Sequence, residues 1–161
     1  MNVHKNKKAA VTFWLLSAVC MGAIFWFSSR TATESTEQSD VFVAWLMQLF
    51  GESELWVFIV RKSAHCLEFT GLSLLLSAAW YYTGSRKPLL FAIVCTSLYA
   101  VTDEFHQQFV EGRSCELRDW VIDTVGGILG AIAFLVLLQI IRRIAAKRHS
   151  KRNKPLLEED I

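Results

Sequence analysis

The sequence predicts an all-α integral membrane protein, built as a bundle of about four transmembrane helices. Of its 161 residues, 53% are hydrophobic, which is high for a water-soluble domain. Long apolar segments alternate with short polar ones, and most of the 17 basic residues fall in three of the polar segments. We therefore expect one membrane domain over residues 1–141, followed by a basic cytoplasmic tail over residues 142–161 that is flexible.

The first span is expected over residues 9–27, an uncharged run that follows three lysines. Its length is close to the roughly 20 residues that cross a hydrocarbon core. A cleavable signal peptide usually has a shorter apolar region, of about 7 to 15 residues, so an uncleaved anchor is preferred. Residues 28–40 are polar, and the apolar residues of 41–50 then recur at helical spacing. This pattern predicts a short interfacial helix between spans one and two.

Three further spans are expected. The second, over residues 63–83, ends at a short Gly-Ser-Arg-Lys-Pro connection. The third, over residues 89–110, crosses the membrane only if the helix continues through an acidic stretch. The fourth, over residues 120–141, carries Gly126 and Gly130, a pair of small residues whose spacing permits close contact with another helix.

The distribution of basic residues predicts the orientation of the chain. They concentrate at the amino terminus, at residues 86–87 and in the tail, and four spans place these three segments on one side of the membrane. The positive-inside rule then predicts a multi-pass protein of the cell membrane with both termini in the cytoplasm. The basic tail does not predict nucleic-acid binding, because no recognition motif accompanies it.

Ionisable and polar residues at or within the predicted spans gather at one depth. They come from the start of span two, the end of span three, the following loop and the start of span four, all of which are expected at the outer surface. An ionisable residue within a membrane segment is a functional-site hypothesis by default. The candidates are Arg61, Lys62, His65, Glu68, Asp103, Glu104, Gln107, Arg113, Asp119 and Asp123.

Two interpretations of this set involve no chemical reaction. The charges could pair with one another and hold the helices in register, since buried charges need partners. Asp119 and Asp123 are assigned to such polar contacts within the bundle. Alternatively, the basic groups could bind a lipid phosphate or a carboxylate, for which arginine offers a bidentate fork. The residues assigned to anion or ligand binding are Arg61, Lys62, Gln107 and Arg113.

Two further interpretations involve catalysis or a metal ion. A histidine can act as general acid or base near neutral pH, and carboxylates can orient it. The catalytic candidates are His65, Glu68, Asp103 and Glu104. His65 and Glu68 also form an H-x-x-E pair, but nearby basic residues oppose a cation and the four cysteines include no C-x-x-C pair. We predict no metal, and the sequence identifies no cofactor.

Three ordered motifs carry a resemblance to a known family. The segments R-K-S-A-H-C-L-E-F at 61–69, D-E-F-H-Q-Q-F at 103–109 and D-W-V-I-D-T-V-G-G at 119–127, together with Arg113, resemble the VanZ-like family. The resemblance covers nearly all of the chain except the basic tail. It implies a small polytopic membrane protein of bacterial type, whose namesake is linked to resistance to the glycopeptide teicoplanin. The family's motif positions correspond to Arg61, Lys62, His65, Glu68, Asp103, Glu104, Gln107, Arg113, Asp119, Asp123 and Gly126.

The leading hypothesis is a cell-envelope protein that binds an anionic headgroup at the outer leaflet and thereby affects teicoplanin susceptibility. The expected partner is a membrane lipid or a lipid-linked wall precursor. The alternative is an intramembrane enzyme that modifies such a headgroup by acid and base chemistry. The sequence leaves open whether the chain is an enzyme. A transporter is disfavoured, because the spans lack the broken helices and paired repeats of an alternating site.

Overall fold

The fold is described here from a computed structural model, which covers residues 5–53 and 55–153. Across these residues the chain forms five helices and no strand, which confirms the all-α prediction. The helices are α1 (Lys7–Ser28), α2 (Ala32–Phe50), α3 (Leu55–Thr83), α4 (Pro88–Gln107) and α5 (Leu117–Asn153). Each expected span corresponds to one long helix, α1, α3, α4 or α5.

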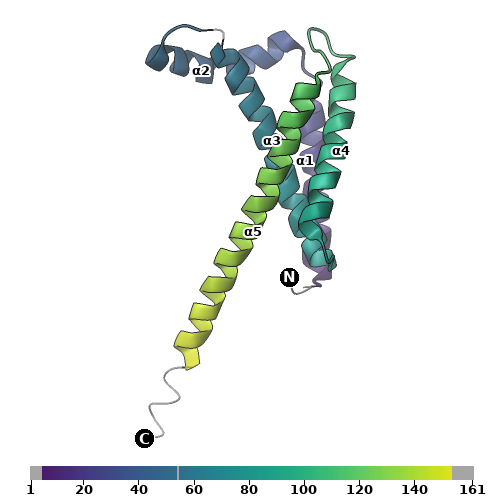
Figure 1. Cartoon of the computed structure of the whole chain (residues 1–161), viewed down its shortest axis with the longest axis vertical. Coiled ribbons are helices and arrows are strands. Elements are labelled where there is room, and N and C mark those ends of the chain that lie inside the picture. Colours follow the sequence, from purple (N-terminus) through teal and green to yellow (C-terminus); the bar gives the residue numbers. More distant parts are fainter. Residues whose placement is uncertain (1–4, 54, 154–161) are drawn as a thin grey trace, which may run out of the picture.

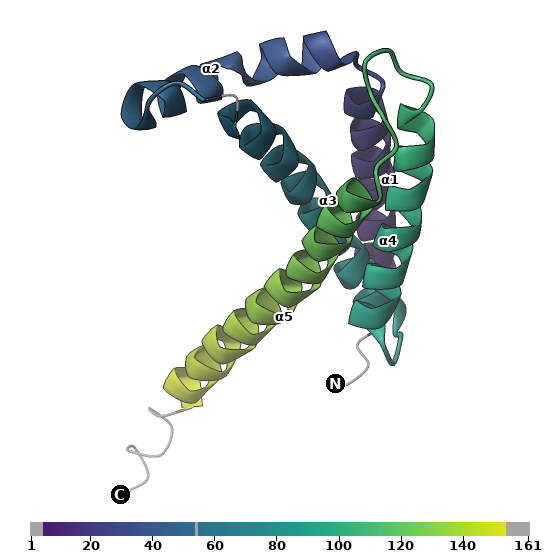
Figure 2. The same ribbon diagram turned by 45° about the horizontal axis from the view of Figure 1, so that its top comes forward.

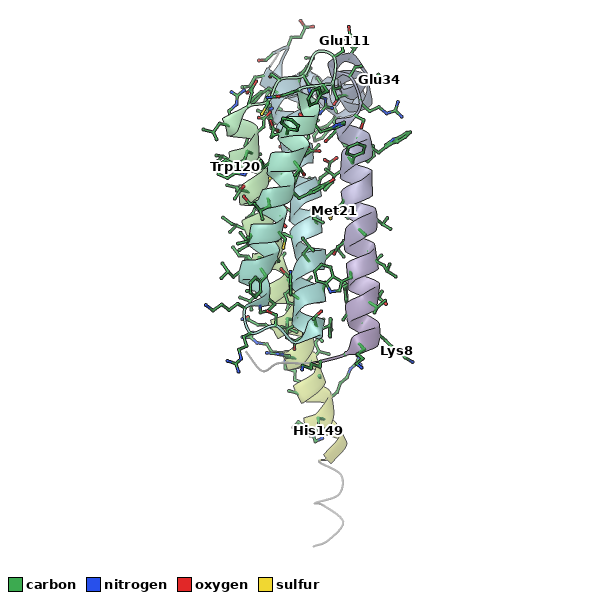
Figure 3. All side chains as sticks on the ribbon, turned by 90° about the vertical axis from the view of Figure 1, so that its right-hand side faces the viewer. Lys8, Met21, Glu34, Glu111, Trp120 and His149 are labelled. Atoms are coloured by element: carbon green, nitrogen blue, oxygen red, sulfur yellow. The ribbon has the colours of Figure 1, made fainter. Side chains whose placement is uncertain are left out.

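Four helices run along the length of the molecule, and α2 lies across one end of them (Figures 1 and 2). The start of α3, the end of α4 and the start of α5 meet at this end, which we call the pocket end. Glu34 and Glu111 lie there, whereas Lys8 and His149 lie toward the opposite end (Figure 3). We call that opposite end the basic end. The three helix ends that the sequence predicts to share one depth thus lie at the same end of the molecule (Figures 1 and 2).

Three helices are long and apolar enough to cross a membrane within the described residues: α1, α4 and the segment Leu117–Ser150 of α5. Helix α3 does not meet this criterion, so its assignment as one of four transmembrane spans stays a prediction. The physical reason is its position, because α3 contacts each of the other four helices of the described chain. Its fully buried Ser73 and Ser77 therefore face protein and not lipid. A helix enclosed by others can carry polar residues that a lipid-facing helix cannot.

The core is divided along α3. Toward the middle of the bundle, Phe69 and Leu72 of α3 are fully buried against Ile24 of α1 and the small residues Ala92 and Ala100 of α4. Nearer the basic end, a second cluster joins α3 to α5 and consists of Ala78, Tyr81, Phe134 and Leu138. Helix α3 is thus the element on which the others are assembled.

Glycine residues allow α5 to approach α3 closely. A Cβ atom added to Gly126 would lie 2.5 Å from the carbonyl oxygen of Cys66, and one added to Gly130 would lie 2.9 Å from the backbone nitrogen of Leu74. Both separations are shorter than van der Waals contact. The sequence-based inference that this pair permits close helix contact is therefore confirmed.

Several element boundaries differ from the sequence-based ones. Helix α2 begins at Ala32, well before the expected residue 41, because Thr31 and Glu34 form a capping box. Helix α4 ends at Gln107 and the chain then turns, so the third span stops short of residue 110. Helix α5 continues to Asn153, so the first part of the expected flexible tail is helical. Residues 154–161 of that tail lie outside the described residues.

Candidate functional site

A pocket of about 520 Å³ opens at the pocket end, between the start of α3 and the connection from α4 to α5. Six of the sequence-predicted residues line it: Arg61, Lys62, His65, Gln107, Arg113 and Asp119. The other lining residues are Val57, Phe58, Gly112, Ser114, Glu116 and Arg118. The structure therefore brings all four predicted anion-binding residues to a single cavity.

Two basic residues of this pocket are neutralised by acidic neighbours. Lys62 of α3 forms an ion pair and hydrogen bond with Asp119 of α5. Arg118 donates to Glu116 over 2.6 Å, and Ser114 also donates to Glu116, over 3.0 Å. These contacts close the pocket wall formed by the α4–α5 connection. The polar-contact role expected for Asp119 is consistent with this geometry.

Arg61 and Arg113 have no such ion-paired partner in the described part of the chain, although the charges of three carboxylates, Asp103, Glu68 and Glu104, act on Arg113 from farther away. Among the side chains that the structure describes, no carboxylate forms an ion pair with either guanidinium group. Arg113 donates through Nε to the carbonyl oxygen of Arg30 over 2.9 Å, while its buried Nη1 has no hydrogen-bond partner. Burial, and then the positive charge of Arg61, lower the pKa of Arg113 below its usual value. The two guanidinium groups thus repel each other across a cavity.

A second pocket, of about 220 Å³, adjoins the first and shares its residues Arg61, His65 and Arg113. Its character differs, because aromatic and aliphatic side chains from three helices form much of its wall. These are Phe27 of α1, Phe42 of α2, and Val60 and Ala64 of α3, with Ser35 and Glu68 completing the lining. The basic residues therefore lie between a polar cavity and a partly apolar one.

His65 is well placed for contact with a ligand in either pocket. Its Nδ1 atom is buried without a hydrogen-bond partner. The nearest carboxylate oxygen recorded for it, Oε2 of Glu68, lies 3.9 Å away, which is too far for a hydrogen bond. Neither Glu68 nor Asp103 orients the imidazole through a hydrogen bond in this structure, although the catalytic interpretation expects one of them to do so.

The remaining predicted acids lie beneath the pockets and line neither of them. Asp103 accepts hydrogen bonds from Ser28 of α1 and Gln107, both over 2.8 Å, and so ties α1 to α4. Glu104 accepts from the backbone N–H of Glu116 over 2.9 Å, which fastens the connection to the end of α4. Asp123 is 1% exposed, and both of its carboxylate oxygens lack a partner. Asp103 and Glu104 thus hold the site together from below.

Sequence reasoning missed two groups that hold the predicted site residues in place, one for Asp103 and one for Arg113. Ser28 at the end of span one donates to Asp103, and the carbonyl oxygen of Arg30 accepts from Arg113. A serine at the polar boundary of span one was the available signal for the first contact. No sequence signal exists for a backbone carbonyl. His106, whose ring lies 4.3 Å from that of Phe25 and stacks on it, has a packing role.

Within residues 5–53 and 55–153, no group of three or more histidine, cysteine, aspartate or glutamate side chains is arranged to hold a metal ion. The four cysteines are all free, and Cys115 is exposed in the α4–α5 connection. Four lysine and arginine side chains line the two pockets, together with the carboxylates of Glu68, Glu116 and Asp119, and two of these carboxylates are paired with Lys62 and Arg118. This excess of positive charge suits an anion better than a cation.

Comparison with known proteins supports the resemblance noted in the sequence. No curated protein and no solved structure matches the chain. A family model described as VanZ/LLP1 matches residues 13–139, which include both pockets and all four long helices, apart from the two ends of the chain. This match confirms the expected family, and the three candidate spans agree with a membrane protein. The chain belongs to the VanZ/LLP1 family.

Proposed function

We propose that this protein is a cell-envelope membrane protein that binds an anionic headgroup in the pocket around Arg61 and Arg113. The headgroup belongs to a membrane lipid or to a lipid-linked wall precursor. The observation that carries the proposal is the pair of arginines without a described carboxylate in ion-pair contact, one of which keeps a buried Nη1 without a partner. An anion between two like charges removes their repulsion and supplies the missing hydrogen-bond acceptor.

The proposal includes an orientation in which the pocket end faces outward. Its support is the charge of the basic end, where Lys8 and the basic residues of α5 lie (Figure 3). Single cysteines at residues 85, 115 and 150, each on a cysteine-free background, test it. An impermeant thiol reagent added to intact cells should label only the native Cys115, which is exposed. Labelling of Ser85→Cys and Ser150→Cys, with Cys115 protected, would invert the topology and direct attention to cytoplasmic ligands.

Binding is tested with a matched pair of arginine variants. Phosphatidylglycerol should raise the melting temperature of the purified protein by several degrees relative to phosphatidylcholine, because a ligand that binds only the folded state stabilises it. Arg61→Gln should lose most of that shift. Arg118→Gln is the control, since Arg118 lines the same pocket but is paired with Glu116. Equal shifts for wild type and Arg61→Gln would remove the basis of the proposal.

The proposal extends to teicoplanin, the link that the family resemblance implies. A wall precursor held by its anionic group at the outer leaflet presents less of itself to a glycopeptide. Arg61→Gln should then increase teicoplanin susceptibility to the level of cells without the protein, while Arg118→Gln should not. Unchanged susceptibility in Arg61→Gln cells, with lipid binding lost, would separate binding from resistance.

One observation favours an intramembrane enzyme as the second candidate. His65 lines both pockets, and its Nδ1 atom is free of hydrogen bonds, as a general acid or base beside a headgroup requires. In such an enzyme, His65→Gln abolishes turnover of the headgroup and keeps the lipid-induced shift in melting temperature. Arg61→Lys weakens that shift, because a lysine lacks the bidentate fork. An equal loss of binding in the two variants would argue against catalysis.

A further inference from the structure

The proposed site is not enclosed on all sides by polar groups. Arg61, His65 and Arg113 form a shared wall, with the larger polar pocket on one side and the smaller pocket on the other. A ligand whose charged group contacts this wall from the larger pocket therefore has a partly apolar cavity directly beside it. A soluble anion has no apolar part that could pack in this cavity, whereas an amphiphile has one.

The apolar wall of the smaller pocket is itself exposed. Phe42 of α2 is 67% exposed and Phe27 of α1 is 46% exposed, although both line this pocket. Ala64 of α3 is exposed as well. The smaller pocket thus opens at the outside of the bundle between α1, α2 and α3. In a membrane protein, exposed apolar side chains at such a place contact lipid chains.

Helix α2 extends the same apolar surface away from the pocket. Phe42, Trp45 and Leu49 follow helical spacing along one face, and their exposed fractions are 67%, 59% and 56%. Because α2 lies across the pocket end (Figures 1 and 2), this face lies in the plane expected for an interfacial helix. Phe42 belongs both to this face and to the smaller pocket, so the apolar face of α2 leads directly to the pocket that the two arginines line.

We infer that the ligand is a membrane lipid with a phosphate headgroup, which enters sideways between α2 and α3. Its phosphate contacts Arg61 and Arg113, and the first part of its acyl chain lies against Phe27, Phe42 and Ala64. This inference rests on the proposed function and adds to it the class of ligand and its route. The Nη1 atom of Arg113 that lacks a partner supplies the donor for one phosphate oxygen.

Two probes with the same phosphate monoester test this inference: glycerol 3-phosphate and its diacylated form, dioleoyl phosphatidic acid. Native mass spectrometry of the full-length protein, released from detergent with both probes at equal concentration, reports which adduct forms. We expect at least about tenfold more lipid adduct, because each methylene group removed from water adds to the affinity. Equal occupancy by the two probes would overturn the lipid inference and leave the anion site intact. If neither probe binds, the proposed function fails too.

Blocking the smaller pocket should remove the preference for the lipid. Ala64→Trp fills it, so the lipid adduct should fall at least about fivefold while the glycerol 3-phosphate adduct stays unchanged. Ser63→Trp is the matched control, because Ser63 is exposed on the same helix and lines neither pocket. An unchanged lipid adduct in Ala64→Trp would overturn the proposed route.

A second pair guards against a folding defect in the tryptophan variant. Phe42→Gln removes an apolar wall at an exposed position, and Leu49→Gln makes the same change farther along the exposed face of α2. Only Phe42→Gln should reduce the lipid adduct. An equal reduction in both variants would mean that α2 acts through general membrane contact and not through the pocket. Arg61→Gln should reduce both probes together, and no change there would overturn the anion site itself.

Discussion

Buried polar groups are hydrogen-bonded differently in two regions of α3 and α5: the place where the two helices cross, and the pocket end. At the crossing, Ser73 donates to the carbonyl oxygen of Gly127 over 2.6 Å, and Thr70 donates to that of Gly126 over 3.1 Å. At the pocket end, the buried Nη1 of Arg113 and both carboxylate oxygens of Asp123 have no partner. At the crossing, these two hydroxyl groups have hydrogen-bond partners within the fold, whereas at the pocket end several buried atoms of charged side chains have none among the described residues.

The difference between the two regions identifies the charged side chains that the fold itself does not neutralise. Some neutral groups below the pocket end also lack partners, among them the hydroxyls of Ser77 and Thr96. A buried hydroxyl without a partner costs far less than a buried charge. Lys62 is satisfied by Asp119. Of the basic residues that line the pockets, Arg61 and Arg113 are therefore the two without a described carboxylate in ion-pair contact, and the proposed anion would supply that contact.

The largest expected effect is a loss of stability at the crossing of α3 and α5. Gly126→Ala places a methyl group 2.5 Å from the carbonyl oxygen of Cys66, so α5 must move away from α3. We expect a loss of about 2 kcal/mol in unfolding free energy, since overpacking typically costs 1 to 3. Equilibrium unfolding in mixed micelles measures it. Gly71→Ala is the control, because nothing lies within 4 Å of its added Cβ. A comparable loss at both glycines would mean that the crossing is less close than described.

An intermediate effect separates the two buried aspartates at the pocket end. Asp103→Ala leaves Ser28 and Gln107 without their shared acceptor, and a buried donor left unsatisfied costs about 1 to 3 kcal/mol. Asp123→Ala removes two carboxylate oxygens that bind nothing. We therefore expect Asp103→Ala to be less stable than Asp123→Ala by about 1 kcal/mol, measured by the same unfolding assay. The reverse order would show that Asp123 has a partner that holds the bundle together.

Much of this arrangement could be predicted from sequence, because it depends on local patterns and on topology. Apolar runs predict the long helices, and four spans bring the start of α3, the end of α4 and the start of α5 to one depth. Which charges remain unpaired could not be predicted. Lys62 and Arg61 are adjacent in the sequence, yet a one-residue rotation around α3 gives only Lys62 an acidic partner in α5. The apolar wall of the smaller pocket was also missed, since Phe27 and Phe42 meet there only through the fold.

The smallest expected effect concerns the exposed ion pair at the rim of the pocket. Hydrogen bonds from Ser114 and then Arg118 lower the pKa of Glu116 below its usual value. A carboxylate whose pKa is lower in the folded state stabilises the fold above its unfolded pKa and loses that contribution as the pH falls through the folded one. Glu116→Gln should therefore cost at most about 0.5 kcal/mol at neutral pH and nothing in acid, because exposed ion pairs contribute little. Unfolding measured at both pH values checks this. A larger loss at neutral pH, or one that persists in acid, would show that the Glu116 side chain supports the connection beyond this exposed ion pair, because the substitution leaves the backbone N–H that donates to Glu104 unchanged.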